Sequence, residues 1–280
     1  MCEFCLRHGE GKKWYLRAEN YSADLLSDAR RRRFVEKFFD GGSLRAAPER
    51  LEALDRIPRF LRRAVAWRAG RKMKKWHFGQ VVPIEEIEEI LGFVNSIVRV
   101  ACVCRLTTVG AEKRFCYGVS LGPGAGGIFD LLKGLDRSFL SGPDTAGFET
   151  MNRAEALAAM KELEKEGLCH TVWTFRTPYI GGICNCDRAD CLAMRATLGH
   201  DVPMMFRAEF VAEIDPDSCT GCRECRRVCP FGALEWSVSS GKASVDQRHC
   251  WGCGVCRSAC PPSAIRLLDR ARVPAAAGVW

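Results

Sequence analysis

The C-terminal third of the sequence contains two runs of cysteine with the same spacing. Residues 217–236 read DSCTGCRECRRVCPFGALEW, and residues 247–268 read QRHCWGCGVCRSACPPSAIRLL. Each run contains Cys-x2-Cys-x2-Cys-x3-Cys-Pro, and the first cysteines, Cys219 and Cys250, are 31 positions apart. Thiolates bind soft metal ions and the iron of iron–sulfur clusters. The repeat therefore predicts two similar metal centres.

The spacing favours a cubane cluster over a zinc ion. A cubane has four iron corners, each of which takes one thiolate, and three cysteines on a tight loop reach three corners but rarely the fourth. The last cysteine of each run is therefore expected to cross over to the other cluster. Zinc sites use two pairs of ligands, not two triplets each followed by a remote Cys-Pro, and a pair of zinc sites is the alternative.

Residues 210–270 resemble the bacterial-type two-cluster ferredoxin domain. The resemblance rests on the two cysteine runs, on the prolines that end them, and on matching residues after each proline: Pro230, Pro261, Ala233-Leu234 and Ala264-Ile265. It implies one 4Fe-4S cluster held by Cys219, Cys222, Cys225 and Cys260. It implies a second held by Cys250, Cys253, Cys256 and Cys229. Two clusters on a small scaffold suit the relay of single electrons.

Nine of the 17 cysteines lie outside these ligand sets. CVCR at 102–105 and CNCDRADC at 184–191 each contain Cys-x-Cys, and we expect at least one further iron–sulfur cluster there. A structural zinc ion or buried free thiols are the alternatives. The candidate ligands are Cys102, Cys104, Cys116, Cys184, Cys186 and Cys191. A second additional site would include Cys2 and Cys5, whereas Cys169 lies in an apolar strand, where a lone cysteine packs as a small hydrophobic residue.

The upstream cysteine block, from CVCR through GLCH to ICNC, is loosely similar to the leading part of uncharacterised multi-cluster ferredoxin proteins. This likeness implies no defined activity. Gly181 and Gly182 would allow the backbone to approach an inorganic core closely. GGICNCDRADC is therefore expected to complete a site that begins at CVCR.

Composition indicates a globular protein. Of the 280 residues, 47% are hydrophobic and 27% are charged. The longest apolar run, LGFVNSIVRVACVC from Leu91, is too short and too polar to cross a bilayer. The opening MCEFCLRHGEGKKWYL has no apolar core of a secretory signal. These features favour a cytoplasmic location, where thiols stay reduced and disulfides are rare.

The order of expected elements predicts an α+β protein with three regions. Residues 1–82 form a basic, mainly helical region, residues 83–203 a small mixed α/β cysteine-rich domain, and residues 204–280 a ferredoxin-like domain with a C-terminal tail. Helices are expected over residues 22–40 (capped by Ser22 and ended by Gly41-Gly42), 58–78, 83–96 and 152–167. Strands are expected over residues 96–101, 114–121, 168–175 and 204–215, and a hairpin over residues 231–247.

Positive charge is concentrated at the N-terminal end. Residues 1–78 carry 20 Lys and Arg against 10 Asp and Glu, whereas the whole chain has a net charge of +8. Residues 58–78 have eight basic residues and no acidic one, with Phe60, Ala64 and Trp67 at helical spacing. Such a helix can dock an acidic protein, lie on an anionic membrane, contact nucleic acid or be a solvated face.

The partner that we expect is a redox protein, within a larger oxidoreductase complex docked through this basic region. Freely diffusing ferredoxins of the resembled family tend to be acidic, which argues against a simple mobile carrier. Peripheral membrane contact is the lesser alternative, and nucleic acid is not expected.

Other motifs carry weaker signals. GPGAGG at 122–127 matches Gly-x-Gly-x-x-Gly, but a dinucleotide site would need a longer βαβ unit and an acidic residue at the end of the next strand. His170 and His200 are isolated, and isolated histidines are more often ordinary hydrogen-bonded residues than ligands. No Ser-His-Asp or paired-carboxylate arrangement stands out.

Three functions from different classes fit these patterns. The favoured one is an oxygen-sensitive electron-transfer protein with two 4Fe-4S clusters, and with one or two additional clusters or a zinc ion upstream. The second is an oxidoreductase whose upstream iron–sulfur site reduces a small substrate. The third is a redox-sensing nucleic-acid-binding protein, suggested by the basic region and by the helix-strand-turn-strand pattern of residues 152–182.

Overall fold

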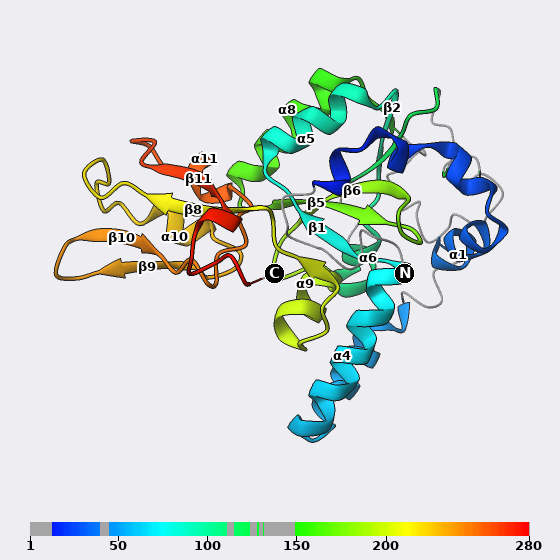
Figure 1. Ribbon diagram of the computed structural model, residues 1–280, viewed down its shortest axis with the longest axis horizontal. Coiled ribbons are helices and arrows are strands. Elements are labelled where there is room, and N and C mark those ends of the chain that lie inside the picture. The colour runs from blue at the N-terminus through cyan, green and yellow to red at the C-terminus, as the bar shows by residue number, and fades with distance from the viewer. Residues whose placement is uncertain are drawn as a thin grey trace.

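The protein has the α+β architecture that the sequence predicts (Figure 1). The computed structural model describes residues 13–39, 45–110, 115–123, 128, 131 and 149–279. A central sheet carries helices, a C-terminal region extends to one side, and the helix α4 projects from the body (Figure 1). In the described part of the chain, no helix is long and apolar enough to cross a membrane.

The described residues before the sheet are helical, as expected. Three 3-10 segments, η2 (Trp14–Leu16), η3 (Ala18–Tyr21) and η4 (Ala23–Ser27), precede the α-helices α1 (Ala29–Phe39), α3 (Ala47–Asp55) and α4 (Arg59–Trp76). The helix expected over residues 58–78 is thus confirmed as α4.

The single helix expected over residues 22–40 is wrong, because the chain turns at Asp28. The Asp28 carboxylate accepts hydrogen bonds from the backbone N–H groups of Arg30 and Arg31, at 2.7 and 2.9 Å, and so starts α1 separately from η4. Ser22 caps only the short segment η4, where its Oγ accepts the N–H of Asp24. The stop expected at Gly41-Gly42 lies outside the described residues.

A seven-stranded sheet forms the centre of the body, in the order β4-β2-β3-β6-β5-β1-β7. Its strands are β1 (Gly79–Val81), β2 (Ser96–Val100), β3 (Cys116–Ser120), β4 (Glu149–Thr150), β5 (Cys169–Thr174), β6 (Ile180–Cys186) and β7 (Met205–Phe206). Neighbours are antiparallel except β1 and β7. The expected strands β2, β3 and β5 are confirmed, and strands from all three regions of the sequence contribute to the sheet.

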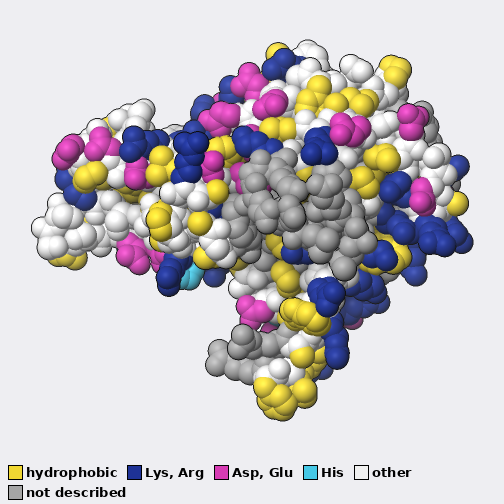
Figure 2. All heavy atoms as spheres, viewed as in Figure 1, with side chains coloured by type: hydrophobic (Ala, Val, Ile, Leu, Met, Phe, Trp, Pro, Cys, Tyr) yellow, Lys and Arg dark blue, Asp and Glu magenta, His cyan; other side chains and the backbone are white. Residues whose placement is uncertain are grey.

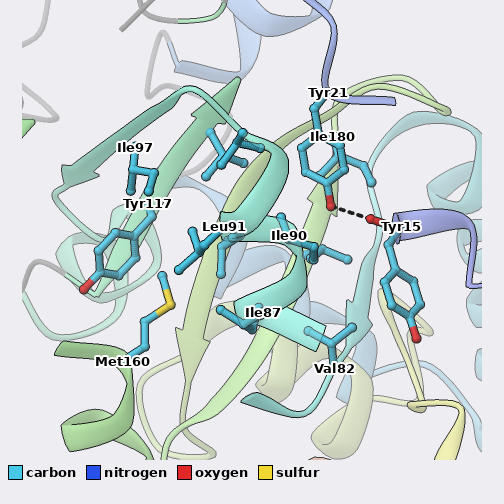
Figure 3. Close-up of a cluster of buried hydrophobic side chains, with 14 of the residues drawn as sticks. Tyr15, Tyr21, Val82, Ile87, Ile90, Leu91, Ile97, Tyr117, Met160 and Ile180 are labelled. Atoms are coloured by element: carbon cyan, nitrogen blue, oxygen red, sulfur yellow. Dashed lines mark hydrogen bonds between the residues drawn. The ribbon is translucent and has the colours of Figure 1, made fainter. Parts of the chain in front are cut away.

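One face of the sheet is covered by α5 (Ile84–Phe93) and α8 (Arg153–Lys165), both at their expected places. Asn152 and Glu155 form a reciprocal capping box that starts α8. Alternate strand residues point to this face and pack with the two helices into one buried cluster (Figure 3). Its members include Ile87, Ile90, Leu91, Ile97, Tyr117, Met160 and Ile180. The apolar side of α5 is therefore part of the core.

The other face of the sheet carries cysteines and the short helices α6 (Val103–Val109) and α9 (Leu192–Met194). In the strand register Cys116 lies directly opposite Cys184, and Cys169 lies directly opposite Cys186. Residues directly opposite each other point to the same face, as do residues two apart in a strand. These four cysteines therefore share one face, away from α5 and α8.

The C-terminal region is a small unit of paired strands and short helices. Its elements are β8 (Phe210–Ile214), α10 (Glu224–Val228), β9 (Leu234–Ser237), β10 (Lys242–Val245), α11 (Val255–Ser258), β11 (Ile265–Asp269) and η6 (Arg270–Arg272). β8 pairs with β11, and β9 with β10. The expected hairpin is confirmed.

The single strand expected over residues 204–215 is instead two strands, β7 in the main sheet and β8 in the C-terminal region. The chain leaves the main sheet at Ala208, whose N–H donates to the carbonyl of Trp251 at 2.9 Å. The carbonyl of Ala208 accepts from Nε of the buried Arg270 at 2.8 Å. These partners come from more than 40 positions away, so local alternation could not reveal the break.

The C-terminal region packs directly on the body. Arg257 of α11 forms an ion pair with Glu85 of α5, with a shortest N–O distance of 2.7 Å. One buried cluster also crosses the boundary. It includes Cys169, Cys186 and Cys191 from the body, and Val228, Trp251 and Cys253 from the C-terminal region.

Candidate metal centres

The eight C-terminal cysteines line two separate cavities. One cavity is lined by Cys219, Cys222, Cys225 and Cys260. The other is lined by Cys229, Cys250, Cys253 and Cys256. In each cavity three cysteines come from one run and the fourth comes from the other run. These are the two groups that a crossover of the last cysteine predicts, while ligation by each sulfur remains a prediction.

The two cysteine loops depend on glycines with positive φ. Gly221 (φ 71°) and Gly252 (φ 70°) each lie between the first and second cysteine of a run. A Cβ on Gly252 would lie 2.0 Å from the carbonyl oxygen of Phe210, and one on Gly221 would lie 2.1 Å from that of Gly241. Only glycine permits both the left-handed conformation and this close approach of two backbones.

Backbone N–H groups point at the cysteine sulfurs. The N–H groups of Ala212 and Gly252 lie 3.3 and 3.4 Å from Sγ of Cys250, and that of Ala264 lies 3.3 Å from Sγ of Cys260. Burial raises the pKa of Cys250, and the two N–H bonds act against this shift by stabilising the thiolate. A bound metal would displace the thiol proton of Cys250, because the thiolate is the form that binds metal.

Residues 212–261 match the family of 4Fe-4S dicluster domains. The C-terminal part of the chain is a ferredoxin-type iron–sulfur domain. The matched segment includes all eight cysteines that line the two cavities, which supports the binding of 4Fe-4S clusters there. The match does not extend to the upstream cysteines, and no curated protein matches the chain.

The two cavities of the ferredoxin-type domain are unequally covered. Cys222 is exposed, whereas Cys250, Cys253 and Cys256 are each 7% exposed. The buried cavity is also lined by Trp251, which stacks on Phe231 with ring centroids 4.7 Å apart. This buried cavity lies on the side of the domain that packs on the body, because Trp251 and Cys253 belong to the cluster that crosses the boundary.

Six upstream cysteines come together on the sheet face opposite α5 and α8. Contacts between their side-chain sulfurs run in the order Cys184, Cys116, Cys102, Cys104, Cys191 and Cys186. The Sγ atoms of Cys186 and Cys191 are 3.3 Å apart. Since Cys184 and Cys186 share a face of β6, we call this set the six-cysteine ring. All six are free thiols, and all six are the upstream candidates named from the sequence; Cys2 and Cys5 lie outside the described residues.

Short helices position the ring members that are not on strands. Cys102 is the N-cap residue of α6, which also contains Cys104, and Cys191 is the N-cap residue of α9. Asp187 accepts the backbone N–H of Asp190 at 2.6 Å and so shapes the turn between Cys186 and Cys191.

Arg105 is a functional candidate that the sequence reasoning missed. It is 1% exposed, donates Nη1 to Sγ of Cys102 at 3.4 Å, and forms an ion pair with Asp187. Hydrogen bonds from Cys104 and Cys116 lower the pKa of Cys102, and the Arg105 charge lowers it further. Cys102 is therefore the ring member most disposed to be a thiolate. The signal was present, because Arg105 and Asp187 are part of the CVCR and CNCD motifs.

Cys169 lies beside the ring but is not part of the chain of contacts. It is fully buried in the cluster that joins the body to the ferredoxin-type domain. Burial raises the pKa of its thiol. The expectation that it packs as a hydrophobic residue is confirmed.

The weaker motifs have ordinary structural surroundings. Nδ1 of the buried His170 lies 2.6 Å from Oδ1 of Asn185, and burial lowers the pKa of His170 to about 4. Nδ1 of His200 lies 3.3 Å from Oδ1 of Asp55. Residues 124–127 of GPGAGG lie outside the described residues. The strands of the helix-strand-turn-strand pattern at residues 152–182, β5 and β6, are interior strands of the main sheet, so they do not project as the free hairpin of a nucleic-acid-binding domain.

Within the described ranges, no three His, Cys, Asp or Glu side chains are placed to hold a single metal ion. This is expected for the ferredoxin-type domain, because each thiolate of a cubane binds a different iron and the sulfurs do not converge on one point. The six-cysteine ring shares this property.

Proposed function

We propose that the protein is an electron-transfer subunit that relays single electrons within, or to, a larger oxidoreductase. The pair of four-cysteine cavities in the ferredoxin-type domain carries this proposal. Their linings contain cysteines, apolar residues, Gly254, Thr220 and Arg223, and no carboxylate or histidine. Bound 4Fe-4S clusters would supply one-electron carriers, while the chain holds the sulfurs and donates N–H bonds to them.

The first test counts the iron of the ferredoxin-type domain alone. In anaerobically purified Cys116→Ala/Cys184→Ala protein, in which the six-cysteine ring is broken, we expect about eight iron and eight sulfide per chain. Reduction with dithionite should give the paramagnetic resonance of two interacting one-electron centres. A well-folded variant that contains zinc instead of iron, or that takes up no electrons, would contradict the proposed function.

The projecting helix α4 is the surface that we propose for the redox partner. It contains no acidic residue, and its side toward the body includes the buried Ala66 and Gly70. The stripe noted in the sequence faces solvent instead, with Phe60 74% and Trp67 59% exposed. Exposed basic side chains follow Trp67 along the half of α4 nearer the body: Arg68, Arg71, Lys72 and Lys75.

The basic and apolar character of α4 indicates the chemistry of the partner. Basic side chains gather over the part of α4 nearer the body, and hydrophobic ones over its free tip (Figure 2). Aromatic residues and arginine are enriched in the cores of protein interfaces. An acidic protein surface with an apolar centre would complement both features, and opposite charge would steer the encounter.

Neutralising this surface should slow electron exchange with an acidic partner. We expect Arg68→Gln/Arg71→Gln/Lys72→Gln/Lys75→Gln to reduce the second-order rate with flavodoxin, an acidic probe, by about tenfold at low salt. The difference should shrink at high salt, and visible absorption should not change.

A matched control would neutralise four exposed basic residues elsewhere, Lys161, Lys165, Arg248 and Arg272. This control should leave the rate nearly unchanged. Equal rates for the α4 variant and the wild type would contradict the proposal. Binding of the wild type to phosphatidylserine vesicles, with no salt-dependent exchange with flavodoxin, would indicate a membrane surface instead.

A further inference from the structure

The six-cysteine ring has the number and arrangement of sulfurs for a metal cluster of its own. We propose that it holds a third iron–sulfur cluster, beside the centre formed by Cys229, Cys250, Cys253 and Cys256. This inference rests on the proposed function, because it adds a carrier to the same electron relay. It depends on the number and contacts of the sulfurs, on the groups around them, and on their neighbours.

The number of the sulfurs and the order of their contacts suit a polynuclear core. Around one zinc ion four thiolates lie roughly 3.8 Å apart, as a Zn–S bond of about 2.3 Å in a tetrahedron requires, so every pair is in contact. In the ring the contacts join sulfurs in sequence, such as Cys102 with Cys104 and Cys116. Among the residues described here, no three donors surround one point. Six thiolates exceed the four that one zinc ion takes, whereas a polynuclear core has several metal corners that each take one thiolate.

The groups around the ring would stabilise the negative charge of a thiolate-bound cluster. The buried guanidinium of Arg105 donates to Sγ of Cys102 at 3.4 Å and to the carbonyl of Asn185 at 3.2 Å. Oγ1 of Thr171 lies 3.5 Å from Sγ of Cys186. Hydrogen bonds and positive charge at the sulfurs are the means by which a protein adjusts a cluster's potential. The Arg105 side chain thus forms hydrogen bonds with both Cys-x-Cys segments, and one of these bonds is to the candidate ligand Cys102.

The six-cysteine ring lies beside the buried centre formed by Cys229, Cys250, Cys253 and Cys256, which we call the inner centre. Cys169 on β5 lies opposite Cys186 on β6 in the strand register. Cys169 also belongs to the same buried cluster as Cys253. The contact between ring and domain therefore runs through packed side chains, with Val228 and Trp251 beside it. One electron leaving the reduced inner centre would reduce the ring's cluster, with no other reactant needed.

Metal analysis of the whole protein tests the third cluster. We expect about twelve iron and twelve sulfide in the anaerobic wild type, and about eight of each in Cys116→Ala/Cys184→Ala. Cys102→Ala/Cys191→Ala, which alters the helix N-caps and not the sheet, should also give about eight. Cys169→Ala, a control at a buried cysteine outside the ring, should keep about twelve. The reduced wild type should show a further paramagnetic signal, coupled to the inner centre, that both double variants lack.

The outcomes separate this inference from the proposed function. Equal iron, near eight, in the wild type and both double variants would overturn the third cluster and leave the electron relay standing. Eight iron with added zinc in the wild type, lost in the double variants, would overturn it in favour of a zinc–thiolate site. A double variant that folds but holds far fewer than eight iron would count against the proposed function itself.

Discussion

Replacing Cys260 with serine is expected to destroy the centre of Cys219, Cys222 and Cys225, although these residues lie 35 or more positions earlier in the chain. The reason is that Cys260 lines their cavity and not that of its own run. In a Cys116→Ala/Cys184→Ala background, iron should fall from about eight to about four per chain. The measurement is iron and sulfide analysis together with low-temperature paramagnetic resonance.

A second substitution identifies which centre remains. Adding Cys222→Ala to Cys260→Ser should remove no further iron, because both residues line one cavity. Adding Cys253→Ala to Cys260→Ser should remove the remaining iron, because Cys253 lines the other cavity. If Cys222→Ala, and not Cys253→Ala, abolishes the remaining signal, the crossover of the last cysteine is refuted.

Gly252→Ala is expected to disrupt the inner centre of the ferredoxin-type domain. The new Cβ would lie 2.0 Å from the carbonyl oxygen of Phe210 and 2.6 Å from its carbonyl carbon, so backbone and not a flexible side chain must move. β8 would be pushed away from the loop that carries Cys250 and Cys253. We expect loss of about half of the ferredoxin-type iron and a clear drop in the anaerobic urea midpoint.

Gly232→Ala is the matched control for that substitution. Gly232 has φ 68°, close to the 70° of Gly252, but a Cβ there would meet no atom within 4 Å. It should therefore report only the cost of a left-handed alanine, about 1–2 kcal/mol, and should retain all iron. Equal destabilisation and equal iron in the two variants would show that the close approach to Phe210 has no role in holding the centre.

The ferredoxin-type domain was the most predictable part of the molecule, because its information is local. Each loop fixes three cysteines within seven positions, and the fourth ligand follows from the repeat itself. Helices with strong end signals were similarly accessible. α8 has both members of a capping box and Gly167 after its last turn, at φ 96°.

Features that depend on remote partners could not be read from the sequence. The six-cysteine ring requires the register of β3 on β6, which sets Cys116 opposite Cys184 across 68 positions. The buried role of Arg105 depends on an aspartate 82 positions away. The break at Asp28 depended on a local choice between one continuous helix and a new cap, which apolar periodicity does not resolve.

The outward-facing side of α4 shows a related limit of pattern analysis. Phe60, Ala64 and Trp67 have the spacing of a buried stripe, yet all three are exposed because Ala66 and Gly70 make the contact with the body. Gly70 approaches Pro203 so closely that an added Cβ would lie 2.2 Å from its ring. Small residues, which carry little weight in a hydrophobic pattern, decided the orientation of this helix.

The unequal covering of the two ferredoxin-type cavities has a consequence for survival in air. Cys222 is exposed, whereas Cys250, Cys253 and Cys256 are each only 7% exposed. Dioxygen or peroxide would reach the first centre straight from bulk solvent, but would have to diffuse through packed protein to attack the second. Oxidative loss of iron should therefore begin at the centre that contains Cys222. A partly oxidised sample should retain about half of its visible absorption, with the surviving iron at the centre of Cys250, Cys253 and Cys256.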